Sequence, residues 1–277
     1  KQALWNCYGT VIDAFEYYSM LSDDHYASHV IDAASFRVFI QDCKIADNNT
    51  CTFQVIDKIF QLENAEETSA SDLFGAPNQA DKVEGEGGEE GGEALLEKEG
   101  ENGQGGQSAM NEANDDNALM RFEFLGCVAR IAVEKYIKSG RKNDVSDAIT
   151  ALCEQNIDVN LGPEAIHDSN DFRKDRLYLH AVDKVFVMHL EKLHHLFDHF
   201  GRADHGGEGN RMHMEEWLHF IEAAGLYGDD FEVLEAKLAF GWAQMTVVDE
   251  VNNRPKFTSM DFCDFLEALA RICDLKA

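Results

Sequence analysis

The sequence predicts an all-α protein built from four helix–loop–helix units in two pairs. Proline is rare, with only three in 277 residues, and long stretches place apolar residues at helical spacing. Residues 124–131 (FLGCVARI) also align with residues 265–272 (FLEALARI), with Phe, Leu, Ala, Arg and Ile at matching places. Finally, an apolar residue stands five positions before an aromatic residue in four places: Ile31 before Phe36, Leu119 before Phe124, Met212 before Trp217, and Met260 before Phe265. Each occurrence predicts the start of a helix with an apolar inner face, repeated along the chain.

Composition narrows the classes of function. The formal net charge of -28 argues against binding to nucleic acid or to anionic lipid, and it allows basic partners and divalent cations. No apolar run approaches the roughly 20 residues of a membrane span, and no signal peptide is recognisable. The seven cysteines form no CxxC motif, which indicates reduced thiols and a cytoplasmic location. Because the chain opens in the middle of an apolar pattern, we expect it to be a fragment or a processed product.

The N-terminal half begins with an apolar helical stripe over residues 3–18, followed by a polar turn over 22–35. Helices are expected over 36–45 and 52–62. Residues 63–117 then hold 16 acidic and 2 basic residues with long Gly and Glu runs, so about half of the net charge lies there. We expect this segment to be a disordered acidic insertion, because it has too few large apolar residues to offset the entropy of ordering.

Helix is expected to resume over residues 120–136. The longest periodic stretch, 171–200, predicts either one helix or two. Helices over 215–226, 231–248 and 260–273 complete the chain. The predicted organisation is an N-terminal pair, a helical connector and a C-terminal pair, over residues 1–137, 138–170 and 171–277.

Paired units of this kind, with an apolar loop residue four places before a terminal acid and an aromatic residue after it, resemble the EF-hand superfamily. The four-unit arrangement with a long central connection is calmodulin-like. In that family a loop of about 12 residues supplies oxygen ligands to Ca²⁺ and ends in a bidentate acid. The resemblance implies that Ile31 faces Leu119 and that Met212 faces Met260, each pair in a short strand between two loops.

Every loop departs from the family pattern. The first ends in Ser35, which cannot give a bidentate carboxylate. The fourth ends in Asp264 but places Asn253, Pro255 and Phe257 at ligand positions. The second has the best ligand set that the resemblance implies: Glu112, Asn114, Asp116 and Glu123.

The third loop allows two registers. Counting from Asp204 ends the loop at Glu215 but leaves Arg211 at the apolar position. Counting back from Glu216 puts Met212 at the apolar position and enlarges the loop, and packing favours it because Trp217 is then buried. The implied metal ligands of the third loop are Asp204, Glu208, Asn210, Glu215 and Glu216. We expect no cofactor, or at most weak Ca²⁺ in the second and third loops.

Histidines cluster in the C-terminal half, with eight of eleven between His180 and His219. His195 and His199 are four apart and could share a metal ion on one helix face. A polar helix face is the reading that we prefer. No nucleophile and base are placed together by any motif, so the sequence predicts no enzyme.

These features predict a non-catalytic scaffold protein that grips an amphipathic partner helix or a cytoskeletal assembly. Similar degenerate hands serve in cytoskeletal and ciliary adaptors, which implies such a location here by analogy. The alternatives are a Ca²⁺ sensor or buffer using the second and third loops, a histidine-cluster metal protein, and a function of the acidic segment alone.

Overall fold

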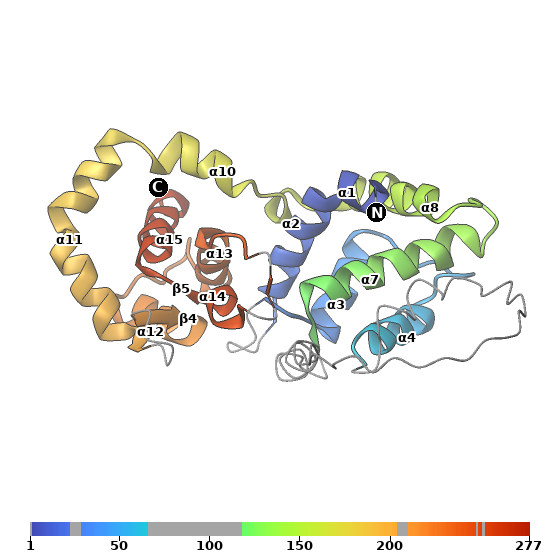
Figure 1. The fold of residues 1–277 in the computed structure, drawn as a ribbon, viewed down its shortest axis with the longest axis horizontal. Coiled ribbons are helices and arrows are strands. Elements are labelled where there is room, and N and C mark those ends of the chain that lie inside the picture. The colour runs from blue at the N-terminus through green and yellow to red at the C-terminus, as the bar shows by residue number, and fades with distance from the viewer. Residues whose placement is uncertain (1, 23–28, 66–117, 204–209, 248, 251–252) are drawn as a thin grey trace, which may run out of the picture.

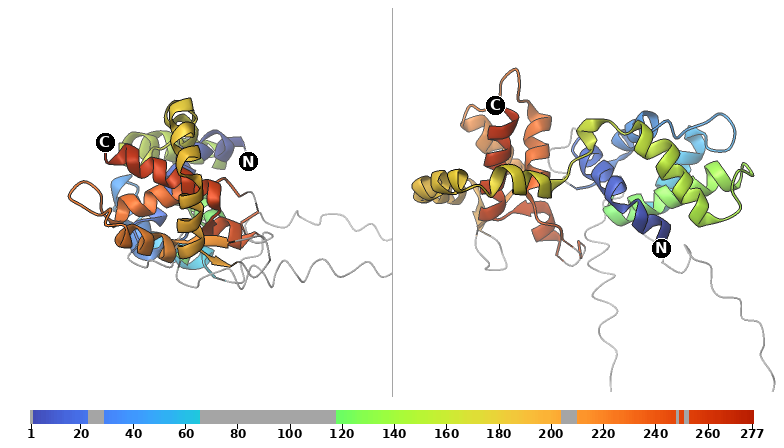
Figure 2. Two further views of the ribbon diagram at one scale, coloured as in Figure 1. Left: turned by 90° about the vertical axis from the view of Figure 1, so that its left-hand side faces the viewer. Right: turned by 90° about the horizontal axis from the view of Figure 1, so that it is seen from above.

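The computed structural model describes residues 2–22, 29–65, 118–203, 210–247, 249–250 and 253–277. These parts are mostly helical, with only short strands between the helices, as the predicted all-α class requires. The helices form two groups, one from each half of the chain (Figure 1). The groups lie side by side when seen from above (Figure 2). No described helix is long and apolar enough to cross a membrane.

The N-terminal group contains the helices predicted for it, with small shifts in their bounds. The apolar helical stripe predicted over residues 3–18 forms two helices, which are separated at Cys7. Thr52 begins the fourth helix by accepting a hydrogen bond from the Val55 amide, as helix-starting threonines do. The elements are α1 (Gln2–Asn6), α2 (Tyr8–Ser19), β1 (Ile31–Asp32), α3 (Ala33–Asp42), α4 (Phe53–Glu63), β2 (Ala118–Leu119), α7 (Arg121–Ala132) and the π-helix η1 (Val133–Ile137).

The acidic insertion, expected over 63–117, lies almost wholly outside the described residues. Its expected first residue does not belong to it. Glu63 ends α4, is buried, and pairs with Arg130 of α7. The ion pair explains the difference, because it draws the acidic end of α4 into the helix group.

Most of the segment predicted as a connector, 138–170, instead completes the N-terminal core, up to Ala165. It forms α8 (Val145–Leu152), η2 (Cys153–Ile157), α9 (Asp158–Asn160) and η3 (Pro163–Ala165). Its apolar side chains, including Ile149, Leu152 and Ile157, are buried in the same cluster as those of α2, α3, α4 and α7.

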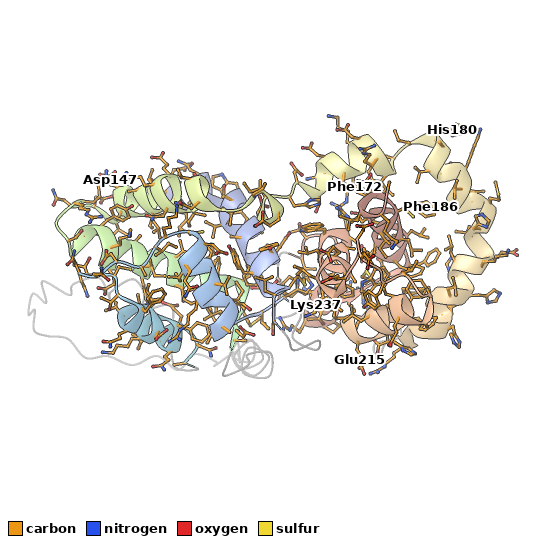
Figure 3. All side chains as sticks on the ribbon, turned by 180° about the vertical axis from the view of Figure 1, so that it is seen from behind. Asp147, Phe172, His180, Phe186, Glu215 and Lys237 are labelled. Atoms are coloured by element: carbon orange, nitrogen blue, oxygen red, sulfur yellow. The ribbon has the colours of Figure 1, made fainter. Side chains whose placement is uncertain are left out.

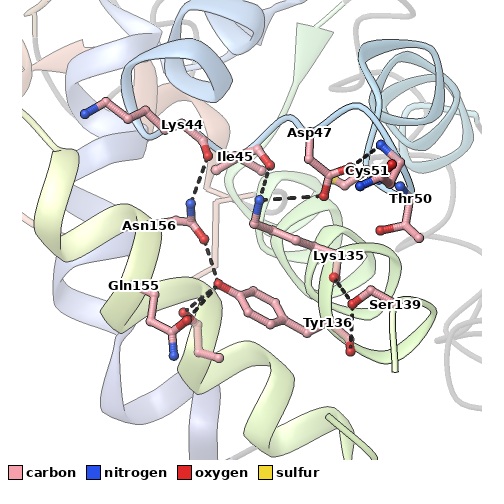
Figure 4. Close-up of polar contacts among 12 residues, drawn as sticks. Lys44, Ile45, Asp47, Thr50, Cys51, Lys135, Tyr136, Ser139, Gln155 and Asn156 are labelled. Atoms are coloured by element: carbon pink, nitrogen blue, oxygen red, sulfur yellow. Dashed lines mark hydrogen bonds and ion pairs between the residues drawn. The ribbon is translucent and has the colours of Figure 1, made fainter. Parts of the chain in front are cut away.

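Polar contacts hold this segment in place (Figure 4). Asn156 donates to the Lys44 carbonyl at 2.9 Å and accepts from the Tyr136 hydroxyl at 2.8 Å. The buried Lys135 amine donates to the Ile45 carbonyl at 2.6 Å. These side chains satisfy the carbonyls of the turn after α3, so the segment and the turn are fixed together.

The C-terminal group begins with two helices where the sequence allowed one or two. The short α10 (Ser169–Phe172) and η4 (Arg173–Leu177) end before α11 (His180–Phe200) starts. Arg173 anchors η4 through Glu267 at 2.8 Å, while Phe197 near the end of α11 packs on Phe265. Both anchors lie on α15, so the chain must turn between them. The remaining elements are β3 (Arg202–Ala203), β4 (Asn210–His213), α12 (Met214–Ala223), α13 (Val233–Ala243), α14 (Arg254–Thr258), β5 (Ser259–Met260) and α15 (Phe262–Leu275).

Two antiparallel strand contacts lie at the centres of the two groups. Ile31 pairs with Leu119, and Met212 pairs with Met260, and all four side chains are fully buried. These are the residue pairs that the family resemblance implied. Each pair is surrounded by aromatic rings in its own core cluster.

The two groups touch at the end of α2. Met20 is buried in the C-terminal cluster, and Tyr17 packs against both clusters. Lys237 of α13 lies at this junction (Figure 3) and donates to the Ser22 carbonyl. From α7, Arg121 reaches the Val247 carbonyl at 2.8 Å. The contacts join parts of the chain more than a hundred residues apart, so only the folded chain defines the junction.

Candidate functional site

The four loop ends share one local geometry. In each, a strand residue is followed by the residue that begins a helix, and the side chain three positions later lies at the first helical turn. In three loops the later residue is an acid whose carboxylate accepts from the backbone amide of the helix-starting residue. The donor and acceptor pairs are Met120 to Glu123 at 2.7 Å, His213 to Glu216 at 2.9 Å, and Asp261 to Asp264 at 3.1 Å. The acids therefore stabilise helix starts, as in a capping box.

The first loop reverses this arrangement. Asp32 begins α3 and accepts from the Ser35 amide at 2.7 Å. This hydrogen bond and its contact with Ser22 hold the pKa of Asp32 below its usual value, although burial acts in the opposite direction. Ser35 contributes no carboxylate, as the sequence predicted, and the local negative charge is on Asp32 instead.

An arginine stands beside the acids of the third loop. The Arg202 Nε lies 2.5 Å from Glu216 Oε1, and its Nη2 lies 3.2 Å from Glu215 Oε2. Glu216 is only 6% exposed, so the positive charge offsets part of the cost of burying its carboxylate. The contact with Glu216 is an ion pair and not a well-directed hydrogen bond. The guanidinium of Arg202 is therefore a positive charge in contact with both acids of this loop.

The register of the third loop is the one that buries Trp217. Met212 pairs with Met260, Glu216 lies at the helix start, and Trp217 is fully buried with its indole donating to the Ala236 carbonyl at 2.8 Å. The alternative register, which ended the loop at Glu215, is wrong. Burial of the largest aromatic side chain decides between the two.

The fourth loop contains the short helix α14. Phe257 of α14 is 8% exposed and points into the protein. Asp264 is buried, and desolvation, assisted by the charge of Asp261, raises its pKa to about 6. Arg211 lowers that pKa, and it donates to the Ser259 hydroxyl at 2.6 Å.

Among the predicted metal ligands in the described parts of the chain, Glu215 and Glu216 are brought to one partner, Arg202, and the others lie apart from them. Asn210 donates to Asp198 at 3.1 Å, whereas Glu215 lies on the outside of α12 (Figure 3). Glu123 and Glu216 belong to different helix groups. Across the described ranges, no three His, Cys, Asp or Glu side chains are arranged to hold a metal ion. Outside the described residues lie Glu112, Asn114, Asp116, Asp204 and Glu208.

The histidine pair does not form a metal centre with a third described residue. His195 and His199 lie on the exposed side of α11. His199 packs edge-on against Phe200, and the neighbouring His194 stacks on Phe262 with ring centroids 3.6 Å apart. These contacts use the rings for packing and agree with the preferred reading of a polar helix face.

A groove of about 1180 Å³ runs between α3 and α4 on the surface of the N-terminal group. Apolar side chains on its wall come from Phe36, Val38 and Phe60. Arg37 of α3 pairs with Asp57 of α4 at 2.5 Å and links the two walls. Its volume exceeds the roughly 300–1,000 Å³ of a small-molecule pocket, so an elongated segment suits it better.

Sequence reasoning missed two arginines in these sites. Arg202 was not considered, and Arg211 was noted only as a misfit in one register. The sequence carried a signal for both, since they flank an enlarged loop whose ligand set is incomplete. Their partners lie between 13 and 48 residues away, and only the β3–β4–β5 sheet brings them close.

Comparisons with protein-family models, with curated proteins and with solved structures found no match.

Proposed function

We propose that this protein is a non-catalytic binding module made of two EF-hand-like pairs that are held together without calcium. The ion pair between Arg202 and Glu216 carries this proposal, because an arginine occupies the charge-neutralising role that a bound cation has in a functional loop. The capping hydrogen bonds of Glu123 and Asp264 support it further. A helix pair stabilised in this way needs no metal ion to keep its shape.

The partner that we propose is a basic amphipathic helix of a cytoskeletal or ciliary assembly, seated in the groove between α3 and α4. The groove offers apolar walls for the anchors of such a helix. The net charge of -28 favours Lys and Arg on the helix's polar face. The cytoskeletal setting rests on the resemblance alone.

Capture of partners from the source cell tests the proposal, with and without a calcium chelator. The wild-type chain is compared with Val38→Glu, which puts a charge on the groove wall. Val233→Glu is the matched control, because Val38 and Val233 are 39% and 38% exposed and only the first lines the groove. We expect Val38→Glu alone to lose the partner.

The chelator should leave binding unchanged, and calorimetric titration with CaCl₂ should give no binding heat at micromolar concentrations. Calcium-dependent capture, or micromolar Ca²⁺ binding with a change in helix packing, would contradict the proposal. Equal loss of the partner in both variants would contradict the assignment of the groove.

A further inference from the structure

A small cavity of about 120 Å³ lies where the two helix groups meet. It is separate from the groove and from the loop ends. Glu16 of α2, Arg121 of α7, Gln244 after α13, and His29 line it. Its volume corresponds to about four water molecules at roughly 30 Å³ each. The site exists only when both groups are in contact.

Buried polar atoms without a hydrogen-bond partner gather around this cavity. They include His29 Nε2, both amide atoms of Gln244, and the Nη1 of Arg254, within the described parts of the chain. The His29 ring is 5% exposed, and Gln244 is one of its polar neighbours, but their contact is not a well-directed hydrogen bond. Each such atom costs about 1–3 kcal/mol of stability, and a bound group with acceptor oxygens would recover the part that belongs to the donors.

The charges around the cavity favour an anion. The guanidinium carbons of Arg121 and Arg254 lie 5.5 Å and 5.7 Å from the centre of the Phe257 ring, and the His29 ring lies 4.6 Å from it. Burial lowers the pKa of His29 to about 3, with a further contribution from the two arginines. Glu250 pairs with Arg121 at 3.3 Å and balances one positive charge. A neutral histidine, an amide and guanidinium groups together suit a planar oxyanion.

We propose that this cavity binds a small planar oxyanion of the carboxylate or bicarbonate class, which joins the two helix groups. The side chains of His29, Gln244 and Arg121 recognise its oxygens. Arg254, whose guanidinium lies over the Phe257 ring, adds positive charge nearby. No redox or covalent step is involved.

Binding of the anion is coupled to a proton on Glu16. Burial, with the charge of Asp13 on the same helix, raises the pKa of Glu16 to about 7, while Arg121, Arg173 and Arg271 from α7, η4 and α15 lower it. An anion in the cavity repels the ionised carboxylate, so it binds to the form with Glu16 protonated. That form is about tenfold less populated at pH 8 than at pH 6, and the apparent affinity should fall by about tenfold.

Thermal unfolding of the full chain tests this site with sodium formate and with sodium bicarbonate, against sodium chloride at equal ionic strength. We expect a saturable rise in Tm with formate, with a half-saturating concentration about tenfold lower at pH 6 than at pH 8. A parallel titration with bicarbonate at pH 8 distinguishes a site for bicarbonate from a site for carboxylates. If neither oxyanion raises Tm above the chloride control, the cavity holds only water and the proposal is wrong.

Three variants locate the effect. Gln244→Leu should abolish the formate-dependent rise in Tm, and Gln54→Leu, an exposed position on α4, should retain it. Glu16→Gln mimics the protonated acid, so its half-saturating concentration at pH 8 should match that of the wild type at pH 6. An unchanged pH dependence in Glu16→Gln would overturn the proposal even if Gln244→Leu does not fold.

Discussion

Arg202 of β3 lies 2.5 Å from the carboxylate of Glu216 at the start of α12. The pair forms because β3 is paired with β4, the strand that leads directly into α12. Arg202 remains largely exposed, whereas Glu216 is buried. The interaction therefore stabilises the acid more than it restrains the arginine.

We expect Arg202→Gln to lower the free energy of unfolding by about 1–2 kcal/mol, because the buried Glu216 carboxylate then loses its counter-charge. Arg202→Lys should recover part of the loss. Arg141→Gln, at an exposed arginine that has no ion pair in the described parts of the chain, is the control. Urea unfolding at neutral pH measures the free energy of unfolding of the three variants. No difference between Arg202→Gln and the control would show that the ion pair is not stabilising.

Asp264→Asn should stabilise the protein at pH 8 and have little effect at pH 4. The folded-state pKa of Asp264, about 6, lies above the usual 3.8 because of burial, so its contribution to stability is present below the lower value and lost as pH rises through the higher one. A difference of about two pKa units corresponds to about 3 kcal/mol at most. Denaturant unfolding between pH 4 and pH 8 measures this difference in the free energy of unfolding. Asp229→Asn, at an exposed position, is the control. A destabilised Asp264→Asn at pH 8 would show that its hydrogen bond needs the charged form.

Acid should weaken the junction between the helix groups through His29. Its pKa is held near 3, mainly by burial, whereas the unfolded value is about 6.5, so stability falls as pH decreases below 6.5. His29→Asn tolerates the left-handed backbone at this position, where φ is 61°, and has no group that titrates. The wild type should lose about 3 kcal/mol relative to this variant between pH 6.5 and pH 4. Parallel pH profiles for the two proteins would contradict this expectation.

Cys7, which is only half-buried, should react with iodoacetamide faster than three of the four buried cysteines, Cys43, Cys51 and Cys127. The neighbouring Cys153 thiol lowers the pKa of the Cys7 thiol, whereas burial raises the pKa of each of the other three. Cys153→Ala should slow the reaction at Cys7, because the group that lowers its pKa is removed. Peptide mass spectrometry after timed alkylation of the folded protein measures both. Equal rates at Cys7 and Cys43 would contradict the lowered pKa of the Cys7 thiol.

The repeat in the sequence was enough to predict the helix starts, and the family resemblance implied the strand pairs. An apolar residue five positions before an aromatic residue recurs at Ile31 and Met212, and both pair as the resemblance implied, with Leu119 and Met260. The repeat locates the helix starts because it records local geometry: a strand residue, a helix start and an inward aromatic side chain follow each other directly along the chain. The same locality explains why most helix bounds were predicted to within a few residues.

Prediction was less successful wherever distant segments meet. Residues 145–157 read as a connector because their apolar face has no partner in the local sequence, yet they pack on α1 and α7 and complete the first core. Two of the implied ligands of the third loop, Asn210 and Glu215, bond to Asp198 and Arg202 instead. The spacing of residues in the sequence does not show that such a side chain is already bonded to a residue from another segment.

The sequence by itself determined the helical class and the four helix starts, because these depend on periodicity and on neighbours within one turn. Only the tertiary structure decided that Arg202 neutralises Glu216, that the segment after α7 belongs to the first core, and that His29, Gln244 and Glu16 share one cavity. Those relationships depend on electrostatic and packing contacts between residues far apart in the chain, and folding alone brings them within range.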